Sequence, residues 1–255
     1  MLQKIIVTLR RYPGVYNFVR SLYRKGILLL GPLMGTRLEE IRWARKSSLS
    51  DSYGWETLNH PHRAFLIDRV VAVPSLHSLL EVGCGVGTNL YLLAKKMPQS
   101  ELLGIDINPN LVKVGNAWFK QEGISNIKLS ISKVNELHAQ PPFDVVITDA
   151  FLMYIGPDKI RGVMKDLLNI ARKALIIVEW HSPKPEPLGF YERNWVRIYV
   201  ILANEFSPEA TIKVLKLPKG GGFDDEMWKK YGTLIEVIKA HRENSTKDLR
   251  ERQNV

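Results

Sequence analysis

The sequence predicts an α/β fold with a doubly wound, mostly parallel sheet of seven strands. Two observations support this fold. From about residue 76, apolar runs typical of strands alternate with helical patterns, as they do when helices cover both faces of a parallel sheet. The first run leads into a turn with glycines at alternate positions, residues 83–87, and a helical pattern follows. We expect a main domain at 51–240, preceded by a basic amphipathic helical extension at 1–50 and followed by a polar tail at 241–255.

Each element follows from the local pattern of apolar residues and turn signals. The first five strands are expected at 76–83, 101–106, 127–132, 143–149 and 174–180. The helices are expected at 88–97, 109–122, 158–171 and 188–205. Two more strands, 211–217 and 233–239, flank a loop with three consecutive glycines and complete the sheet.

The composition is that of an ordinary globular protein. The 255 residues, 45% hydrophobic and 24% charged, are enough for one well-packed domain with an appendage. The single cysteine, Cys84, excludes an internal disulfide and fits a reducing compartment. No apolar run reaches the ~18 residues of a membrane span, and basic residues interrupt any apolar core of a signal peptide. We therefore expect a cytoplasmic protein.

The net charge of +10 is concentrated at the N-terminus. Residues 1–46 hold ten lysines or arginines and two acids, a net charge of +8. Within residues 1–36, aromatic and aliphatic residues alternate with arginines, as in a basic amphipathic helix. Such a helix either lies on an anionic membrane surface, which would make the protein peripheral at the inner face, or packs on protein. A nucleic-acid partner is disfavoured because no basic, aromatic-rich patch continues into the main domain.

The glycine turn and the acids beside it suit an adenosine-bearing ligand. Glu81 ends the first strand, and Asp106 ends the second, where a βαβ unit presents an acid to ribose hydroxyls. The glycines allow the backbone to approach a ligand closely. The dinucleotide fingerprint would need a third glycine at position 88, which is Thr88 here. The ligand is therefore better sought among other adenosine cofactors.

Glu81 and the Gly-x-Gly-x-Gly turn resemble motif I of class I S-adenosylmethionine (SAM) methyltransferases, and Asp106 matches that family's ribose-binding acid. The resemblance covers about residues 60–240. It implies a Rossmann-like fold whose last strand is antiparallel, with SAM as cofactor and S-adenosylhomocysteine as product. The residues it assigns to the cofactor are Glu81, Gly83, Cys84, Gly85, Gly87, Asn89, Asp106, Ile107, Lys133, Val134 and Asp149.

One cofactor position departs from the family pattern. Family members often place an aspartate and then a small residue where Lys133 and Val134 stand. The exocyclic amine of adenine then lacks its expected acceptor, unless Asn135 or a backbone carbonyl replaces it.

The segment after the fourth strand bears on the acceptor. Asp149 is not followed by the two prolines that amino-directed methyltransferases often carry, and the run Leu-Met-Tyr-Ile-Gly-Pro at 152–157 resembles small-molecule methyltransferases. Asp149 is either a proton acceptor or a turn cap. His181, at the end of the fifth strand, is a candidate general base, or else a surface histidine that begins a proline-rich loop. Asp149, Glu179 and His181 do not have a diagnostic metal spacing, so no metal is predicted.

Residues 143–199 more narrowly resemble methylases of bacterial and archaeal surface-sugar biosynthesis clusters, including those for nonulosonic acids. This resemblance implies that Tyr191, Arg193 and Arg197 face an anionic acceptor; the alternative is an amphipathic helix with solvated arginines. The residues predicted to bind the acceptor are Tyr154, Glu179, Tyr191 and Arg193. His60 and His62 precede the main domain in a segment that commonly covers cofactor and acceptor in this fold.

The leading hypothesis is an O-methyltransferase that acts on a hydroxyl of a sugar or glycan precursor, with His181 or Asp149 as the base. Two alternatives stay open. One keeps the chemistry and changes the acceptor to a lipid or quinone, and the other is a non-catalytic SAM-binding partner subunit. The oligomeric state is not predicted by the sequence.

Overall fold

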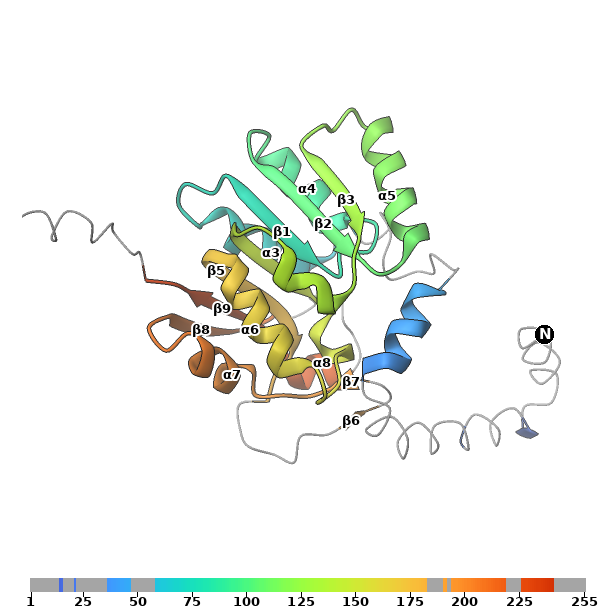
Figure 1. Ribbon diagram of the computed structural model, residues 1–255, viewed down its shortest axis with the longest axis vertical. Coiled ribbons are helices and arrows are strands. Elements are labelled where there is room, and N and C mark those ends of the chain that lie inside the picture. The colour runs from blue at the N-terminus through green and yellow to red at the C-terminus, as the bar shows by residue number, and fades with distance from the viewer. Residues whose placement is uncertain are drawn as a thin grey trace, which may run out of the picture.

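The computed structural model describes residues 14–15, 21, 36–46, 58–182, 190–191, 194–218 and 226–240. Most of the proposed membrane-binding segment at 1–36, Arg193 and the tail at 241–255 lie outside these ranges. Within the described residues, one seven-stranded sheet has helices on both faces (Figure 1). None of the described helices is both long enough and apolar enough to cross a membrane.

The sheet has the predicted, mostly parallel topology. Its strands are β1 (Ser78–Val82), β2 (Glu101–Asp106), β3 (Ile127–Ile131), β4 (Phe143–Asp149), β5 (Ala171–Trp180), β8 (Thr211–Lys216) and β9 (Gly232–Ile238). Their order is β3-β2-β1-β4-β5-β9-β8. Strands β1 to β5 pair in parallel, whereas β9 is antiparallel to both β5 and β8. The expected antiparallel last strand is confirmed, because β9 is last in the chain and inserts between its two neighbours.

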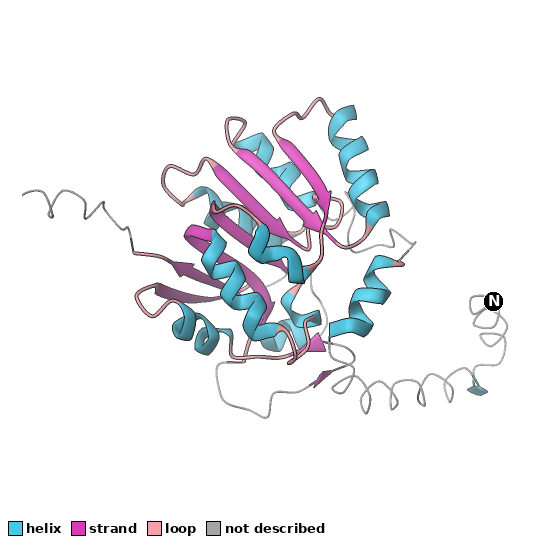
Figure 2. Cartoon of the chain, viewed as in Figure 1, coloured by secondary structure: helices cyan, strands magenta, loops and turns pink. Residues whose placement is uncertain are grey.

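Two sets of helices cover the two faces of the sheet (Figure 2). One apolar core lies between the sheet and α3 (Pro61–Val71), α4 (Thr88–Lys96), α5 (Pro109–Gln121) and α8 (Glu226–Tyr231). The other lies under α6 (Ile160–Ile170), α7 (Tyr199–Phe206) and the 3₁₀ helix η2 (Val134–Ala139). A second 3₁₀ helix, η3 (Leu152–Tyr154), follows β4. Strands buried on both faces explain why β4 and β5 are almost continuously apolar in sequence.

The helix predicted at 188–205 is wrong over its first half. Phe190–Tyr191 (β6) pairs antiparallel with Asn194–Trp195 (β7), and α7 begins only at Tyr199. The chain is extended before α7 because it hydrogen-bonds to the end of β5: the Arg197 amide donates to the Trp180 carbonyl, and the Ser182 amide donates to the Arg197 carbonyl. These long-range bonds fix an extended backbone where the local pattern favoured a helix.

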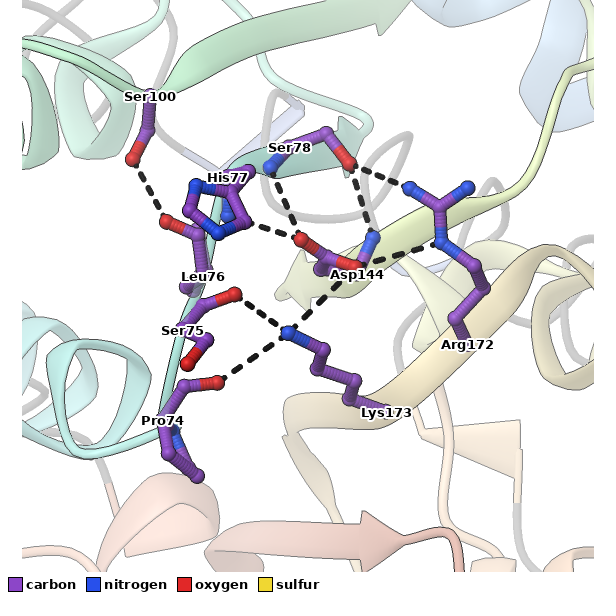
Figure 3. A network of polar contacts seen from close by, with 9 residues as sticks. All are labelled: Pro74, Ser75, Leu76, His77, Ser78, Ser100, Asp144, Arg172 and Lys173. Atoms are coloured by element: carbon purple, nitrogen blue, oxygen red, sulfur yellow. Dashed lines mark hydrogen bonds and ion pairs between the residues drawn. The ribbon is translucent and has the colours of Figure 1, made fainter. Parts of the chain in front are cut away.

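A polar network ties the strands together at their amino ends (Figure 3). The Asp144 carboxylate accepts hydrogen bonds from the amides of His77, at 2.8 Å, and Ser78, at 3.3 Å. Its other oxygen lies 3.3 Å from Arg172 Nε and 3.7 Å from Lys173 Nζ. The Ser78 hydroxyl accepts from the Asp144 amide at 3.0 Å and from the Arg172 guanidinium. One side chain on β4 therefore joins β1 to the start of β5.

Candidate active site

A cavity of about 330 Å³ opens beyond the carboxyl ends of β1 to β4. This is the edge where open parallel sheets bind ligands, because loops from neighbouring strands converge there. Its lining includes the glycine turn after β1, residues 105–107 at the end of β2, residues 132–134 after β3, and residues 149–151 and 153–155 at and after the end of β4. Residues 36–44 are helical and contribute a further wall; we call them the covering helix.

The covering helix is anchored at its start by polar contacts to the segment before α6. The amide and hydroxyl of Thr36 both donate to Asp158 Oδ1 at 3.0 Å. The Thr36 hydroxyl also accepts from the Gly156 amide at 2.9 Å. One turn later, Glu40 accepts a hydrogen bond from Lys159 at 2.7 Å. Thr36 and Glu40 both line the cavity, so this anchor is also part of its wall.

The segment that follows the covering helix is held from the start of α5. The Asn108 side-chain amide donates to the carbonyls of Trp43 and Lys46, each at 2.9 Å. The Asn108 oxygen simultaneously caps α5. The Trp43 ring meets the Tyr154 ring edge-on, with centroids 5.0 Å apart. The sequence boundary expected at residue 50 assigned this segment to the extension, whereas the structure places residues 36–46 over the cavity of the main domain.

The glycine turn is packed on one side and open on the other. A Cβ on Gly83 would lie 2.5 Å from the Phe151 ring, and its φ of +77° is left-handed. A Cβ on Gly85, also left-handed at +57°, would meet nothing within 4 Å among the described atoms. Gly85 lines the cavity, so the open side of the turn is the side on which a ligand can approach the backbone. Gly87 is left-handed as well, but it faces Phe119 in the core.

Glu81 offers the cavity a buried carboxylate oxygen without a partner. Its Oε1 accepts a hydrogen bond from the Asn89 side chain at 2.7 Å, whereas Oε2 has no partner among the described residues. Burial raises the pKa of Glu81 to about 8, against the opposing effect of the Asn89 hydrogen bond. An unsatisfied buried acceptor is costly, and the ammonium of an amino-acid ligand would satisfy it.

Asp106 joins the glycine turn to the start of α5. One oxygen accepts from the Gly85 amide at 2.9 Å, and the other accepts from the Asn108 amide at 2.8 Å. Burial raises the pKa of Asp106, and these amide donors oppose that shift. Each carboxylate oxygen has two acceptor sites, so both can still accept from the ribose hydroxyls. Ile107 and Leu111 line the cavity beside Asp106 and can pack on an adenine ring.

The position that departs from the family pattern also lies in the cavity. Lys133 and Val134 line it, whereas Asn135 does not, as far as the described residues define the lining. The Glu136 carboxylate accepts from the Lys133 amide at 2.9 Å and from the Ser132 hydroxyl at 3.1 Å, which caps η2. These contacts hold the backbone of the segment but add no side-chain acceptor for the adenine amine.

Asp149 carries a second polar cluster at the end of β4. Its Oδ2 accepts from His62 at 2.9 Å and from Asn89 at 3.1 Å, and Arg63 lies 3.5 Å away. Its Oδ1 is buried and makes no hydrogen bond within the described part of the chain. Burial alone would raise the pKa of Asp149, but the charges of His62 and Arg63 and the hydrogen bonds from His62 and Asn89 outweigh it and hold that pKa below its usual value. Asp149 is therefore an ionised acceptor.

Three residues that sequence reasoning placed at the site have other contacts. Glu179 accepts from the amides of Phe151, Leu152 and Met153 at 2.8, 2.6 and 3.0 Å. Burial raises the pKa of Glu179 to about 8, and these three donors oppose the shift. Arg197 donates to the carbonyls of Leu152, at 3.0 Å, and Ile155. The two buried side chains thus hold the backbone around η3, Glu179 through its amides and Arg197 through its carbonyls.

His181 also lies away from the cavity. Its Nδ1 accepts from the Tyr199 amide at 3.3 Å, at the start of α7, and its side chain is buried. Burial lowers the pKa of His181. Glu179, His181 and Arg197 are all absent from the cavity lining that the described residues form. This corrects their expected contact with the acceptor, because each side chain holds backbone instead.

Tyr154 and the remaining cofactor residues other than Gly87 do line the cavity. The Tyr191 side chain and Arg193 lie outside the described residues. Sequence reasoning missed Arg63, although it stands beside the flagged His62; it donates to the Asn89 oxygen at 2.6 Å and is buried. Arg63 suits the carboxylate of an amino-acid ligand. No group of three potential metal ligands occurs among the residues that the structure describes.

The residues present fit SAM. Glu81 matches its ammonium, Arg63 its carboxylate and Asp106 its ribose, and the turn at Gly85 leaves room for close approach. Residues 79–174 also match the sequence profile of a methyltransferase domain family. The chain therefore carries a methyltransferase domain, and its fold and site are those of class I SAM-dependent methyltransferases.

Individual relatives of this methyltransferase are distant. It is 30% identical to an uncharacterised protein of Rickettsia prowazekii over 95 residues, 36% of this chain and 38% of the relative. It is 27% identical to the demethylmenaquinone methyltransferase of Bacillus subtilis over 139 residues, 52% of this chain and 58% of the relative. The chain thus covers less than two thirds of the length of either relative.

A solved structure shares the fold of this methyltransferase. The magnesium protoporphyrin IX methyltransferase of Synechocystis PCC 6803, with SAM bound, superposes with a TM-score of 0.55 at 14% identity. The match covers 86% of this chain and 96% of that protein. At this identity the likeness shows the fold, and the class I methyltransferase architecture expected from motif I is confirmed.

Proposed function

We propose that this methyltransferase transfers a methyl group from SAM to a hydroxyl of a neutral, ring-containing small molecule, with a sugar or glycan precursor as the acceptor class. The observation that carries the proposal is the wall formed by the covering helix and the loop after β4. It combines aromatic faces, from Trp43, Phe151 and Tyr154, with the carboxylates of Glu39 and Glu40. Aromatic faces pack on the C–H surfaces of rings, and carboxylates accept hydrogen bonds from hydroxyls.

The charges of the cavity favour a neutral acceptor over the anionic one expected from the narrower sequence resemblance. Among the described residues, the arginine and lysine side chains in the lining are Arg63 and Lys133. Arg63 is bound into the Asn89 and Asp149 cluster on the cofactor side. Arg197, expected to face an anion, is buried against two backbone carbonyls. Glu39 is paired with Arg42 and Glu40 with Lys159. The described part of this wall therefore holds no cation left over for an anionic acceptor.

The chemistry asks little of the protein beyond binding and one proton transfer. SAM supplies a methyl group already activated on a sulfonium. The protein must hold the acceptor in line, exclude water and take the proton that the hydroxyl loses. The buried, ionised Asp149 and its partner His62 provide a negative charge in the cavity that favours this proton transfer.

A quinone is the second candidate acceptor. The same wall continues through Met153, Ile155 and Trp228, which are apolar or aromatic and would cover a flat, poorly soluble ring. The B. subtilis relative is named as a demethylmenaquinone methyltransferase, although the present chain covers 58% of it. In this case the methyl group goes to the quinone nucleus, and the carboxylates of the covering helix have no role in binding the acceptor.

An acceptor-independent labelling experiment separates these candidates. The purified protein is incubated with methyl-labelled SAM and a whole-cell extract of its host, which is then divided into glycan, lipid, RNA, protein and small-molecule fractions. The proposal expects label in the glycan or sugar fraction, lost in Asp106→Ala. Label in quinone would replace the sugar by the second candidate, and label in RNA or protein would contradict both. SAM binding without label in any fraction would indicate a non-catalytic SAM-binding subunit.

A further inference from the structure

The covering helix has two sides of different charge, and it lies at the periphery of the described fold (Figure 1). Its inner side lines the cavity with Thr36, Glu39, Glu40 and Trp43. Exposed residues recur at every fourth position on the opposite side, as one stripe of a helix requires. These residues are Arg37, Ile41 and Arg45, which we call the outer face. Both acids of the segment 36–46 therefore lie on the inner side, and the outer face carries cations and an isoleucine.

The cations of the covering helix differ in what holds them. Arg42, beside the outer face, donates to Glu39 at 2.6 Å, and its guanidinium lies over the Trp43 ring, 4.7 Å from the centroid. The side chains of Arg37 and Arg45 are exposed and make no hydrogen bond or ion pair with any other residue that the structure describes. These two guanidinium groups are therefore available to an external anion.

Ile41 indicates which kind of anion fits the outer face. It lies between the two arginines along the stripe and is 44% exposed. Guanidinium groups beside an apolar side chain match the boundary between the headgroups and the acyl chains of an anionic lipid layer. A nucleic-acid backbone would satisfy the arginines but would leave the isoleucine in water. The composition of the outer face therefore favours a lipid surface.

The sequence extends the same charge beyond the helix. Residues 1–35, directly before it, hold six lysines or arginines and no acid. Residues 1–46 carry +8 of the net charge of +10, which leaves +2 for residues 47–255. A charge distribution this uneven steers a protein toward an anionic partner with one end of its chain. The outer face and the segment before it thus favour the same partner.

We propose that the outer face of the covering helix docks this methyltransferase on an anionic phospholipid surface while the inner side lines the acceptor cavity. The wall of the cavity then rests against the membrane, where amphiphilic acceptors are concentrated. This extends the membrane contact expected for residues 1–36 to a face that the structure describes. The inference does not depend on which acceptor is methylated.

The first test measures the binding of the full chain to vesicles by co-sedimentation. We expect binding to vesicles that contain phosphatidylglycerol, a loss of that binding at high salt, and little binding to vesicles of phosphatidylcholine alone. The double variant Arg37→Ala, Arg45→Ala should bind phosphatidylglycerol vesicles about 25-fold more weakly, since each basic residue near an anionic surface contributes roughly fivefold. Its Kd for SAM should stay at the wild-type value, because both side chains lie outside the cavity.

A charge-matched control separates the outer face from general electrostatic adsorption. Lys128 on β3 and Lys213 on β8 are exposed cations outside the cavity lining. The double variant Lys128→Ala, Lys213→Ala should lose less than about twofold, because charges more than ~10 Å from the surface are largely screened. Equal losses in the two double variants would overturn the proposal. Wild-type affinity in Arg37→Ala, Arg45→Ala would also overturn it, and would assign any lipid binding to another part of the chain.

The second test places a probe on the outer face itself. The only cysteine, Cys84, is buried, and burial raises the pKa of its thiol, so it should stay unlabelled. Ile41→Cys, labelled with a polarity-sensitive fluorophore, should shift its emission to shorter wavelength on phosphatidylglycerol vesicles. Val214→Cys is the control, because Val214 is 46% exposed on β8 and is flanked by lysine at position 213.

The emission shifts decide whether the outer face touches lipid. A shift at position 41 and none at position 214 supports the proposal. Equal shifts at both positions, or no shift at position 41 in vesicle-bound protein, would overturn it. Single-stranded RNA that binds as tightly as the vesicles, with the same loss in Arg37→Ala, Arg45→Ala, would replace the lipid by a nucleic acid. None of these outcomes changes the proposed methyl transfer, since the assays contain no acceptor.

Discussion

Strand β4 carries an aspartate near each end, and the two have opposite surroundings. Asp144, at the amino end, accepts from two backbone amides with one oxygen and meets Arg172 and Lys173 with the other. Asp149, at the carboxyl end, accepts from three side-chain donors with one oxygen, and its other oxygen has no partner in the described structure. The first cluster is complete by itself, and the second is not.

This difference separates a structural cluster from a binding cluster. Native proteins satisfy nearly all of their buried polar atoms, so a buried polar atom without a partner needs an explanation, and a bound ligand is one such explanation. Glu81 Oε2 and Asp149 Oδ1 are two such atoms, and both residues line the cavity. The network around Asp144 uses surface cations and backbone amides (Figure 3), and none of its side chains lines the cavity. We therefore expect the aspartate at one end of β4 to serve stability and the one at the other end to serve the proposed reaction.

The largest expected effect is on activity at the carboxyl end. Asp149→Asn should lower turnover about 10²- to 10⁴-fold, because it removes the buried negative charge that favours the proton transfer. The unfolding free energy should change little, because the variant removes a buried charge as well as its partners. Turnover assays and urea unfolding measure the two quantities. Wild-type turnover in this variant would show that the cluster around Asp149 is not needed for activity.

The next largest effect is on stability at the amino end. Asp144→Ala should lower the unfolding free energy by about 1–3 kcal/mol, because it leaves the amides of His77 and Ser78 without their acceptor. Turnover at a temperature where the variant is folded should match that of wild type. Urea denaturation with paired activity assays tests this. An activity loss as large as that of Asp149→Asn would show that the two clusters are not separate in role.

The pH dependence of cofactor binding should follow the ionisation of the Glu81 carboxyl group. The pKa of this carboxyl is about 8 in the folded chain and lies above its ordinary value of 4.5. SAM affinity should therefore rise between pH 6 and 8 as the carboxylate forms, and Glu81→Gln should bind more weakly without that rise. Calorimetric titrations across this range measure it. A flat wild-type profile would mean that Glu81 does not meet the ammonium.

The ionisation of Glu81 should also affect the unfolding free energy, but here a rise in pH should be unfavourable. The folded state holds the Glu81 proton more tightly than the unfolded state, so the stability of the free protein should fall as pH rises from about 4.5 to about 8. Glu81→Gln should reduce this decline. Thermal unfolding without cofactor, in buffers spanning these pH values, provides the comparison.

The smallest effect concerns the anchor of the covering helix. Thr36→Val removes the hydroxyl that bridges Asp158 and Gly156, which costs about 1 kcal/mol. We expect the KM for the acceptor to rise by roughly fivefold with little change in kcat. The exposed Arg37, on the same helix, gives the control Arg37→Ala. An equal shift in both variants would indicate a general effect on the helix and not on its anchor.

The parts of the fold that the sequence could predict are those determined locally. The left-handed glycines after β1 and the acid that ends β2 follow from short-range turn chemistry, and the structure places Glu81, Gly85 and Asp106 together at the cavity. The alternation of apolar runs likewise predicted the strands of the sheet. These features depend on residues close to one another in the chain.

The parts that could not be predicted depend on contacts between distant residues. The extended segment before α7 follows from hydrogen bonds between Arg197 and Trp180, and the position of His181 follows from its bond to Tyr199. The covering helix reaches the cavity only through partners about 120 residues away, such as Asp158. A strand-end histidine and a basic amphipathic segment carry no local mark of such partners.

The contacts that hold the backbone of η3 affect which residues of the cavity wall can be substituted during evolution. Glu179 holds three amides of the loop after β4, and Arg197 holds two of its carbonyls. These contacts involve only peptide groups, which every amino acid shares. The side chains of Phe151, Met153 and Tyr154 can therefore be exchanged through mutation while the path of the wall is kept. Selection for a new acceptor could act on these three positions without rebuilding the scaffold beneath them.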